Sequence, residues 1–139
     1  MGTDIRPELS KKNRYWIEKH RYYELKHFCL QYPIWKKAYL ALTDLKSRPA
    51  DMDSFAKFNN LSDPTWKIAE ARLYYESRMK MIEDTAKRTD DVIGDYILKA
   101  VTQGYSYDTL NVQFGMPCCK EVYYKLYRKF FLLLSHERD

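Results

Sequence analysis

The chain has 139 residues, of which 45% are hydrophobic, 16% are aromatic and only four are glycine. This length predicts one domain whose core needs no metal or disulfide to fold, and the thirteen tyrosines, six phenylalanines and three tryptophans exclude a disordered polar chain. No run approaches the roughly 18 apolar residues that a membrane helix needs, and the net charge of +5 is modest. We therefore expect a soluble, basic, all-helical cytoplasmic protein that makes no contact with membranes.

The charges are unevenly distributed along the chain. Residues 1–50 and 96–139 carry an excess of Lys and Arg, whereas residues 51–95 carry an excess of Asp and Glu. A basic segment gains affinity for phosphates by releasing their counterions, although it can also be a solvated surface without a partner. The charge pattern leaves both interpretations open.

The residue pattern gives little support to a metal site or an enzyme. Cys29 and the adjacent pair Cys118 and Cys119 have neither disulfide-framework nor zinc-ligand spacing, so we predict that they are small buried residues. The sequence lacks a Gly-rich phosphate loop, a nucleophile elbow and a His–Glu metal helix. We expect no catalytic activity, no cofactor and no small-molecule substrate.

The N-terminal part of the chain predicts two helices separated by a proline. Apolar residues recur at near-helical spacing from Glu8 to Tyr32, and Pro33 interrupts this pattern. In the segment 15–23 we expect most aromatic side chains to face the core, with Lys11, Lys12 and Arg14 as an arm that contacts phosphates. The second helix has an apolar stripe that consists of Trp35, Ala38, Tyr39, Leu42 and Leu45.

A long helix is predicted to begin at Ser62-Asp63-Pro64, where a capping side chain precedes a proline in the first turn. Its apolar stripe has a heptad-like spacing that fits either the protein's own core or a dimer seam, and consists of Ile68, Ala71, Tyr75, Met79, Ile82 and Ala86. The next helix is expected to end at Gly104 and to bury Val92, Ile93, Tyr96, Ile97, Ala100 and Val101.

Residues 106–133 follow the plan of a helix-turn-helix. Ser106 is expected to cap a short helix from Tyr107 to Phe114 that buries Leu110 and Phe114, and Gly115-Met116-Pro117 is expected to form the turn. The last helix is predicted to open near Cys118, with an inner stripe of Val122, Leu126, Phe130 and Leu133. A short helix, a glycine turn and a basic second helix are typical of this motif, and a bundle with one solvated basic face is the alternative.

This plan predicts which residues contact double-stranded DNA. Side chains early in the second helix face base edges in the major groove, and later cations contact phosphates. The groove side is then formed by Cys118, Cys119, Lys120 and Tyr124. The phosphate contacts come from Lys125, Arg128 and Lys129, and from Ser106 and Tyr107 at the start of the short helix.

Several short motifs occur in a fixed order, namely Ser62-Asp63-Pro64-Thr65, Met81-Ile82-Glu83-Asp84, Tyr96-Ile97, Gly104, Leu110, Gly115-Met116-Pro117, Val122-Tyr123-Tyr124 and Lys129-Phe130-Phe131. In this order, mainly over residues 62–135, the chain resembles phage-encoded late transcription regulators of the ArpU and RinA type from Gram-positive bacteria, which are similar to region 4 of sigma factors. The resemblance implies that Leu110 and Phe114 form the core of the bracing helix, that Gly115 is the turn, and that residues 120–128 form the recognition surface. The chain has Pro117-Cys118-Cys119 where those families usually begin the recognition helix with Ser or Thr.

We therefore expect an all-α, multi-helix bundle with a C-terminal helix-turn-helix. Residues 1–61 would form a basic, aromatic-rich helical segment, and residues 62–139 would form the long helix and the helix-turn-helix. The expected function is that of a phage or prophage transcriptional regulator that binds double-stranded DNA, with host RNA polymerase as a further partner and a homodimer as a candidate state. The alternatives are a DNA-packaging adaptor of the small-terminase kind and a phage inhibitor that binds a host protein such as a defence factor.

Overall fold

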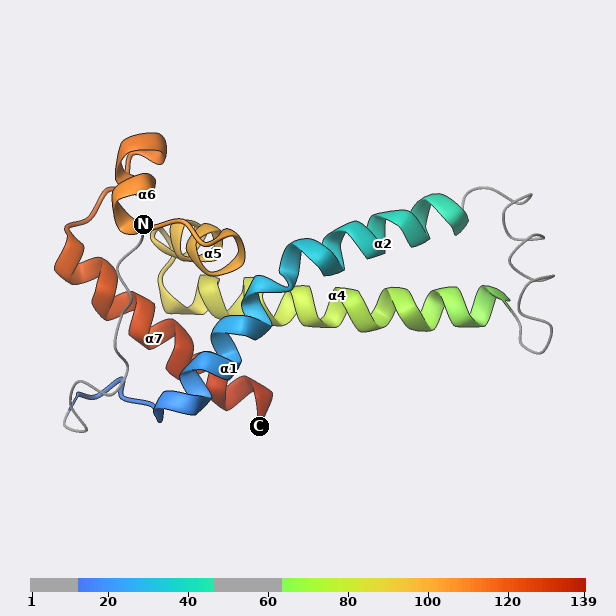
Figure 1. The fold of residues 1–139 in the computed structure, drawn as a ribbon, viewed down its shortest axis with the longest axis horizontal. Helices are drawn as coiled ribbons and strands as arrows, with labels where there is room; N and C mark the ends of the chain where they lie inside the picture. The colour runs from blue at the N-terminus through green and yellow to red at the C-terminus, as the bar shows by residue number, and fades with distance from the viewer. Residues whose placement is uncertain (1–12, 47–63) are drawn as a thin grey trace. The chain divides into compact units, whose positions relative to one another are not determined.

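The computed structural model describes residues 13–46 and 64–139, and these residues form helices joined by short connections, with no strand among them (Figure 1). The predicted all-α class is confirmed. Several features predicted from the sequence lie outside the described residues, namely Lys11 and Lys12 of the arm, the capping residues Ser62 and Asp63, and the domain boundary after residue 61.

Contacts divide the chain into two compact units. The unit that spans Tyr32–Lys80 is called here the α2 unit, and the unit that combines Met1–Gln31 with Met81–Asp139 is called the α7 unit. Helix α4 (Pro64–Thr89) contributes residues 64–80 to the α2 unit and residues 81–89 to the α7 unit. Each unit has its own buried residues and is described by itself.

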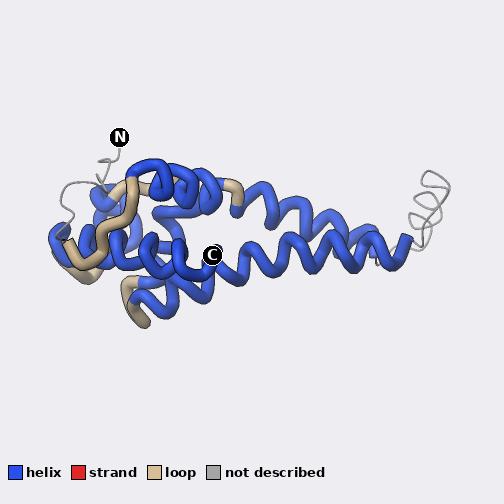
Figure 2. The backbone as a smooth tube through the Cα atoms, turned by 90° about the horizontal axis from the view of Figure 1, so that it is seen from below, coloured by secondary structure: helices blue, strands red, loops and turns tan. Residues whose placement is uncertain are grey.

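In the α2 unit, helix α2 (Tyr32–Lys46) runs alongside the first part of α4 (Figures 1 and 2). Arg72 joins the two helices, because its Nη2 donates to the hydroxyl of Tyr39 at 3.2 Å while the guanidinium lies over the tyrosine ring. The predicted break before the second helix is confirmed, since α2 begins at Tyr32 and Pro33 falls in its first turn, where the missing N–H costs no helical hydrogen bond.

The heptad-like stripe of α4 is buried within the chain. Ile68, Met79, Ile82 and Ala86 are each less than 9% exposed, and Ala71 and Tyr75 are half-buried. The interpretation of this stripe as core is therefore confirmed. The helix also begins at Pro64, as the sequence predicts.

The α7 unit consists of α1 (Lys19–Leu30), the end of α4, α5 (Gly94–Gln103), α6 (Tyr107–Phe114) and α7 (Lys120–Arg138). Helix α1 packs against α5 and α7, and α5 packs against α6. Each helix contributes at least one side chain that is almost completely buried, and these include Leu25, Cys29, Ile82, Ile97, Leu110, Phe130, Phe131 and Leu134.

Helix α1 begins later than the sequence predicts. Glu18 is its N-cap, since Oε2 accepts hydrogen bonds from the backbone N–H groups of His20 at 2.7 Å and Arg21 at 3.1 Å. These contacts satisfy donors that have no partner inside a helix. Residues 13–18 therefore form a turn and an extended connection, in which Ile17 is buried.

The connection from α4 to α5 is a tight turn organised by Asp90. Its Oδ1 accepts hydrogen bonds from the backbone N–H groups of Val92 at 2.9 Å and Ile93 at 2.8 Å. This turn leaves Val92 61% exposed, so the predicted burial of Val92 is wrong, whereas Ile93 is buried. Gly104 ends α5 in the left-handed conformation, as predicted.

The inner stripe of α7 differs from the predicted one. Val122 is 44% exposed while Tyr123 is 2% exposed, and the buried residues continue with Phe130, Phe131 and Leu134. The buried face is shifted because it contains the larger aromatic rings, which remove more apolar surface from water than Val122 would. Leu126 and Leu133 are half-buried, so only Phe130 of the predicted stripe is fully buried.

Arg21 ties α1 to the end of α7. Its Nε donates to the Ser135 hydroxyl and its Nη2 to the Ser135 carbonyl, both at 3.0 Å, and Nη2 also contacts Asp139 Oδ1 at 2.6 Å. The last carbonyls of a helix have no partner within it, so the guanidinium satisfies one of them. Arg21 therefore stabilises the packing of α1 against α7.

Candidate nucleic-acid interface

Helix α6 begins and ends with defined caps. Ser106 Oγ accepts a hydrogen bond from the Thr109 N–H at 3.2 Å, and this cap starts α6 at the predicted residue. Gly115 ends the helix with φ of +64°, a conformation that a residue with a Cβ rarely adopts. Met116 is buried directly after it. Residues 115–119 then lead to Lys120, so α7 begins two residues later than predicted, with Cys119 as its N-cap.

Tyr107 holds this connection against the first turn of α6. Its hydroxyl donates a hydrogen bond to the carbonyl oxygen of Cys118 at 2.7 Å, and its ring centroid lies 5.4 Å from that of Tyr123 at the start of α7. The predicted phosphate contact of Tyr107 would compete with this bond for the hydroxyl hydrogen. The exposed side of α6 includes Phe114, which is 38% exposed, so its predicted burial is wrong. Leu110 is buried as predicted.

Replacing Tyr107 by phenylalanine should lower the free energy of unfolding slightly, because the turn loses one part-buried hydrogen bond while the ring contact remains. Urea denaturation followed by circular dichroism measures this change. Tyr124→Phe is the matched control, since among the described residues none forms a hydrogen bond with the Tyr124 hydroxyl. Equal stability of Tyr107→Phe and the wild type would contradict the role of this hydroxyl.

Aromatic rings fix the inner side of α7. The hydroxyls of Tyr22 on α1 and Tyr127 on α7 lie 3.3 Å apart, and the Phe131 ring packs 5.1 Å from Tyr22 and 5.0 Å from Tyr127. Burial, together with the neighbouring Tyr22, raises the pKa of Tyr127 well above its ordinary value, so this hydroxyl stays protonated. The packing leaves the opposite side of α7 toward solvent.

That opposite side carries several cations, and the nearest acid in the helix is Glu121, four residues before Lys125. From Val122 to His136 the sequence contains no Asp or Glu. Lys125 is exposed, and Arg128 and Lys129, one helical turn further on, are half-buried. We call Lys125, Arg128 and Lys129 the α7 basic face. Their spacing of three and four residues places them side by side on the helix surface.

Three arginines of the α7 unit are paired with carboxylates, whereas no ion pair is formed by the α7 basic face among the described residues. Arg21 contacts Glu24 and Asp139, Arg88 contacts Glu137, and Arg138 lies near Glu24 and over the Phe28 ring. In the part of the chain that the structure describes, no carboxylate forms an ion pair with Lys125, Arg128 or Lys129. Like charges at this spacing repel each other, and a bound anion would relieve that repulsion.

The first turn of α7 is exposed and chemically mixed. Lys120 is exposed with its Nζ 5.9 Å from the Tyr124 ring centroid, and Tyr124 is half-buried. Glu121 and Val122 are both exposed, although the predicted DNA contacts omit Glu121 and the predicted inner stripe includes Val122. Glu121 is favourable at a helix N-terminus and can accept a hydrogen bond from cytosine. Their position directly after Lys120, in the first turn of α7, is the sequence feature that could have identified them as exposed.

The three cysteines occupy different environments. Cys29 is completely buried, as predicted, whereas Cys118 is half-buried and Cys119 is exposed, so the prediction that these two are buried is wrong. Burial, followed by the nearby Cys119 and Asp90, raises the pKa of the Cys118 thiol, which favours the less reactive protonated form. Among the described residues no group of three His, Cys, Asp or Glu side chains could hold a metal ion.

Arg14 lies in the connection before α1. Its guanidinium carbon is 5.0 Å from the Tyr15 ring centroid, and its side chain is exposed. Of the segment 15–23, Tyr22 is buried and Tyr23 is 36% exposed. The structure thus brings together Ser106, Tyr107, Cys118 and the residues of α7, and places Arg14 on a separate segment.

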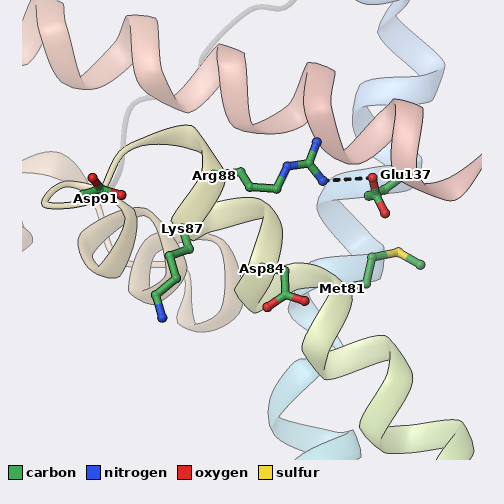
Figure 3. A pocket seen from close by; sticks show the side chains of 6 residues that line it. All are labelled: Met81, Asp84, Lys87, Arg88, Asp91 and Glu137. Carbon is green, nitrogen blue, oxygen red and sulfur yellow. Dashed lines mark hydrogen bonds and ion pairs between the residues drawn. The ribbon is translucent and has the colours of Figure 1, made fainter.

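A shallow depression of about 470 Å³ lies elsewhere in the α7 unit (Figure 3). Side chains of both charges line it, and these belong to Met81, Asp84, Lys87, Arg88, Asp91 and Glu137. One cation is already paired, since Arg88 Nη1 contacts Glu137 Oε2 at 2.9 Å. The lining offers neither a nucleophile nor an aromatic ring for stacking, which makes it a weaker candidate site than α7.

Comparison of the chain with family models, with curated proteins and with solved structures finds no match. No helix in the described ranges 13–46 and 64–139 is both long and apolar enough to cross a membrane.

Proposed function

We propose that the chain binds double-stranded DNA through a helix-turn-helix formed by α6, the turn at Gly115 and α7. The observation that carries the proposal is the α7 basic face, which groups three cations on one helix without an ion pair among the described residues, whereas Arg21, Arg88 and Arg138 of the same unit are paired. A polyanion supplies that counter-charge and releases its own condensed cations on binding.

The length of α7 fits this arrangement. Nineteen residues span roughly 28 Å, whereas the major groove is about 12 Å wide, so only the first turns enter it. Lys120 and Tyr124, four residues apart on one side of the helix, would face base edges there. Arg128 and Lys129, about 12 Å further along the axis from Lys120, would contact phosphates.

The proposed biological role is that of a phage or prophage transcriptional regulator at promoter DNA in the bacterial cytoplasm, with host RNA polymerase as a further partner. The resemblance to the ArpU and RinA type of regulator supports this role. A packaging adaptor of the small-terminase kind would instead form a ring in solution. A phage inhibitor of a host protein would not bind DNA through α7.

Fluorescence anisotropy with a labelled 30-base-pair duplex tests the proposal. At low salt, Arg128→Ala should weaken binding about 5- to 10-fold, because one phosphate contact is lost. Arg88→Ala is the matched control, since it removes the same charge from an exposed pair outside the α7 basic face. Equal affinities of the wild type and Arg128→Ala, or an equal loss in both variants, would contradict the proposal.

A further inference from the structure

Helix α4 carries a second apolar stripe on the side opposite its buried one. Trp66 and Leu73 are 60% and 66% exposed, and Ala69 between them is also exposed. We call Trp66, Ala69 and Leu73 the α4 apolar face. Their spacing of three and four residues is the spacing of a helix-pairing seam. Ile68 and Met79 are buried on the other side of the same helix, and Arg72 contacts Tyr39 of α2.

The α2 unit exposes apolar side chains to an unusual extent for its size. On α2, Ile34 is 67% exposed and Leu40 is 56% exposed, in addition to Trp66 and Leu73 on α4. Among these side chains, Trp66 and Leu73 share one face of α4, and large apolar side chains gathered on one exposed face are typical of a site of association. Two helices alone are too few to bury all of these side chains, so a further surface is needed to cover them.

The charged residues beside the α4 apolar face favour one kind of partner over another. The α4 apolar face is flanked by two acids, Glu70 and Glu76, and by two bases, Arg72 and Lys80. This balance gives no attraction for a nucleic acid, and it lets two copies of the same surface approach without net repulsion. The α7 basic face has the opposite property, because two copies of it would repel each other.

We propose that a second copy of this chain docks on the α4 apolar face, with α4 of one copy packed against α4 of the other about a two-fold axis. A two-fold interface uses the same residues twice. Ala69 lies between the two large side chains and lets the helix axes approach closely, while Trp66 of one copy packs toward Leu73 of the other.

The size of the contact sets the expected affinity. Residues 64–80 span roughly 25 Å of helix, and packed helices lie about 8–10 Å apart. Such a contact is at the low end of specific interfaces, which bury about 800 Å² per partner. We therefore expect a dimer that dissociates in the micromolar range. The α4 apolar face and the α7 basic face share no residue, so dimerisation and DNA binding can be tested separately.

Sedimentation equilibrium of the full chain between about 1 and 200 μM tests the proposal. The average mass should rise from 16.8 kDa toward twice that value with increasing concentration. Leu73→Glu should remain a monomer over the same range, because a charge would lie in the apolar seam. Val112→Glu is the matched control, since Val112 is an 83% exposed valine on α6, and it should dimerise like the wild type.

Ala69→Glu provides a second variant, because this exposed alanine contributes nothing to the core and the helix should form normally; circular dichroism checks that it does. A wild-type chain that stays at 16.8 kDa at the highest concentration would overturn the proposal. A mass well above that of a dimer would also overturn it, as would Leu73→Glu and Ala69→Glu variants that associate like the wild type. None of these outcomes changes the expected effect of Arg128→Ala on DNA binding.

Discussion

Replacing Gly94 by alanine should lower the free energy of unfolding by about 2–3 kcal/mol. Gly94 is buried where α5 leaves the turn after α4, and a Cβ at this position would collide with the carbonyl oxygen of Ala86 and lie 3.0 Å from its carbonyl carbon. The obstacle is backbone within α4, so it cannot rotate away as a side chain would. Alanine favours a helix over glycine by about 1 kcal/mol, and the collision outweighs this gain.

Guanidinium chloride denaturation followed by circular dichroism measures the effect of Gly94→Ala. Gly104→Ala is the control, because Gly104 has a φ of +78° but no neighbouring atom within 4 Å of an added Cβ. Its cost is limited to backbone strain of about 1–2 kcal/mol. A Gly94→Ala variant that is as stable as the wild type would show that α4 and α5 do not approach as closely as the structure describes.

Replacing Lys125, Arg128 and Lys129 together by alanine should weaken binding to duplex DNA on the order of 100-fold at low salt. The variant loses three proposed phosphate contacts, and each such contact contributes through counterion release. Folding should be preserved, because alanine is the best helix former and the removed charges repel one another. The variant is therefore expected to melt at or slightly above the temperature of the wild type.

The matched control replaces Lys19, Lys87 and Arg88 by alanine. It removes the same net charge from exposed positions of the same unit. If binding depended only on total charge, the two triple variants would lose affinity equally. We expect the control to bind within about threefold of the wild type, and an equal loss in both would contradict the assignment of the α7 basic face.

Sequence signals predict the helix boundaries where the cause is local. Pro33, Pro64, Gly104 and Ser106 all mark helix ends where the structure has them, because a cap or a proline acts within one turn. The start of α1 and the inner stripe of α7 were not predictable in this way. Several registers of α7 offer an apolar face, and the packing of Tyr123 rather than Val122 against the rest of the unit selects one of them.

The candidate site was predictable only in part, because some of its features depend on contacts between distant segments. The basic residues of the last helix are visible in the sequence, but which of them form ion pairs with the other described residues depends on contacts between distant segments. Arg21, for example, contacts Asp139, which lies 118 residues away in the chain. The hydrogen bond from Tyr107 to Cys118 likewise joins a helix to a turn and has no sequence signal.

The dependence of DNA affinity on salt tests the proposed function most directly. The logarithm of the binding constant falls with the logarithm of salt concentration by about 0.9 per phosphate contact. With the three cations of the α7 basic face on phosphates, we expect a slope of about −3 for the wild type, and a slope of magnitude below about 1 for the Lys125, Arg128 and Lys129 triple variant. A wild-type slope near zero, or the same slope for both proteins, would contradict DNA binding through α7.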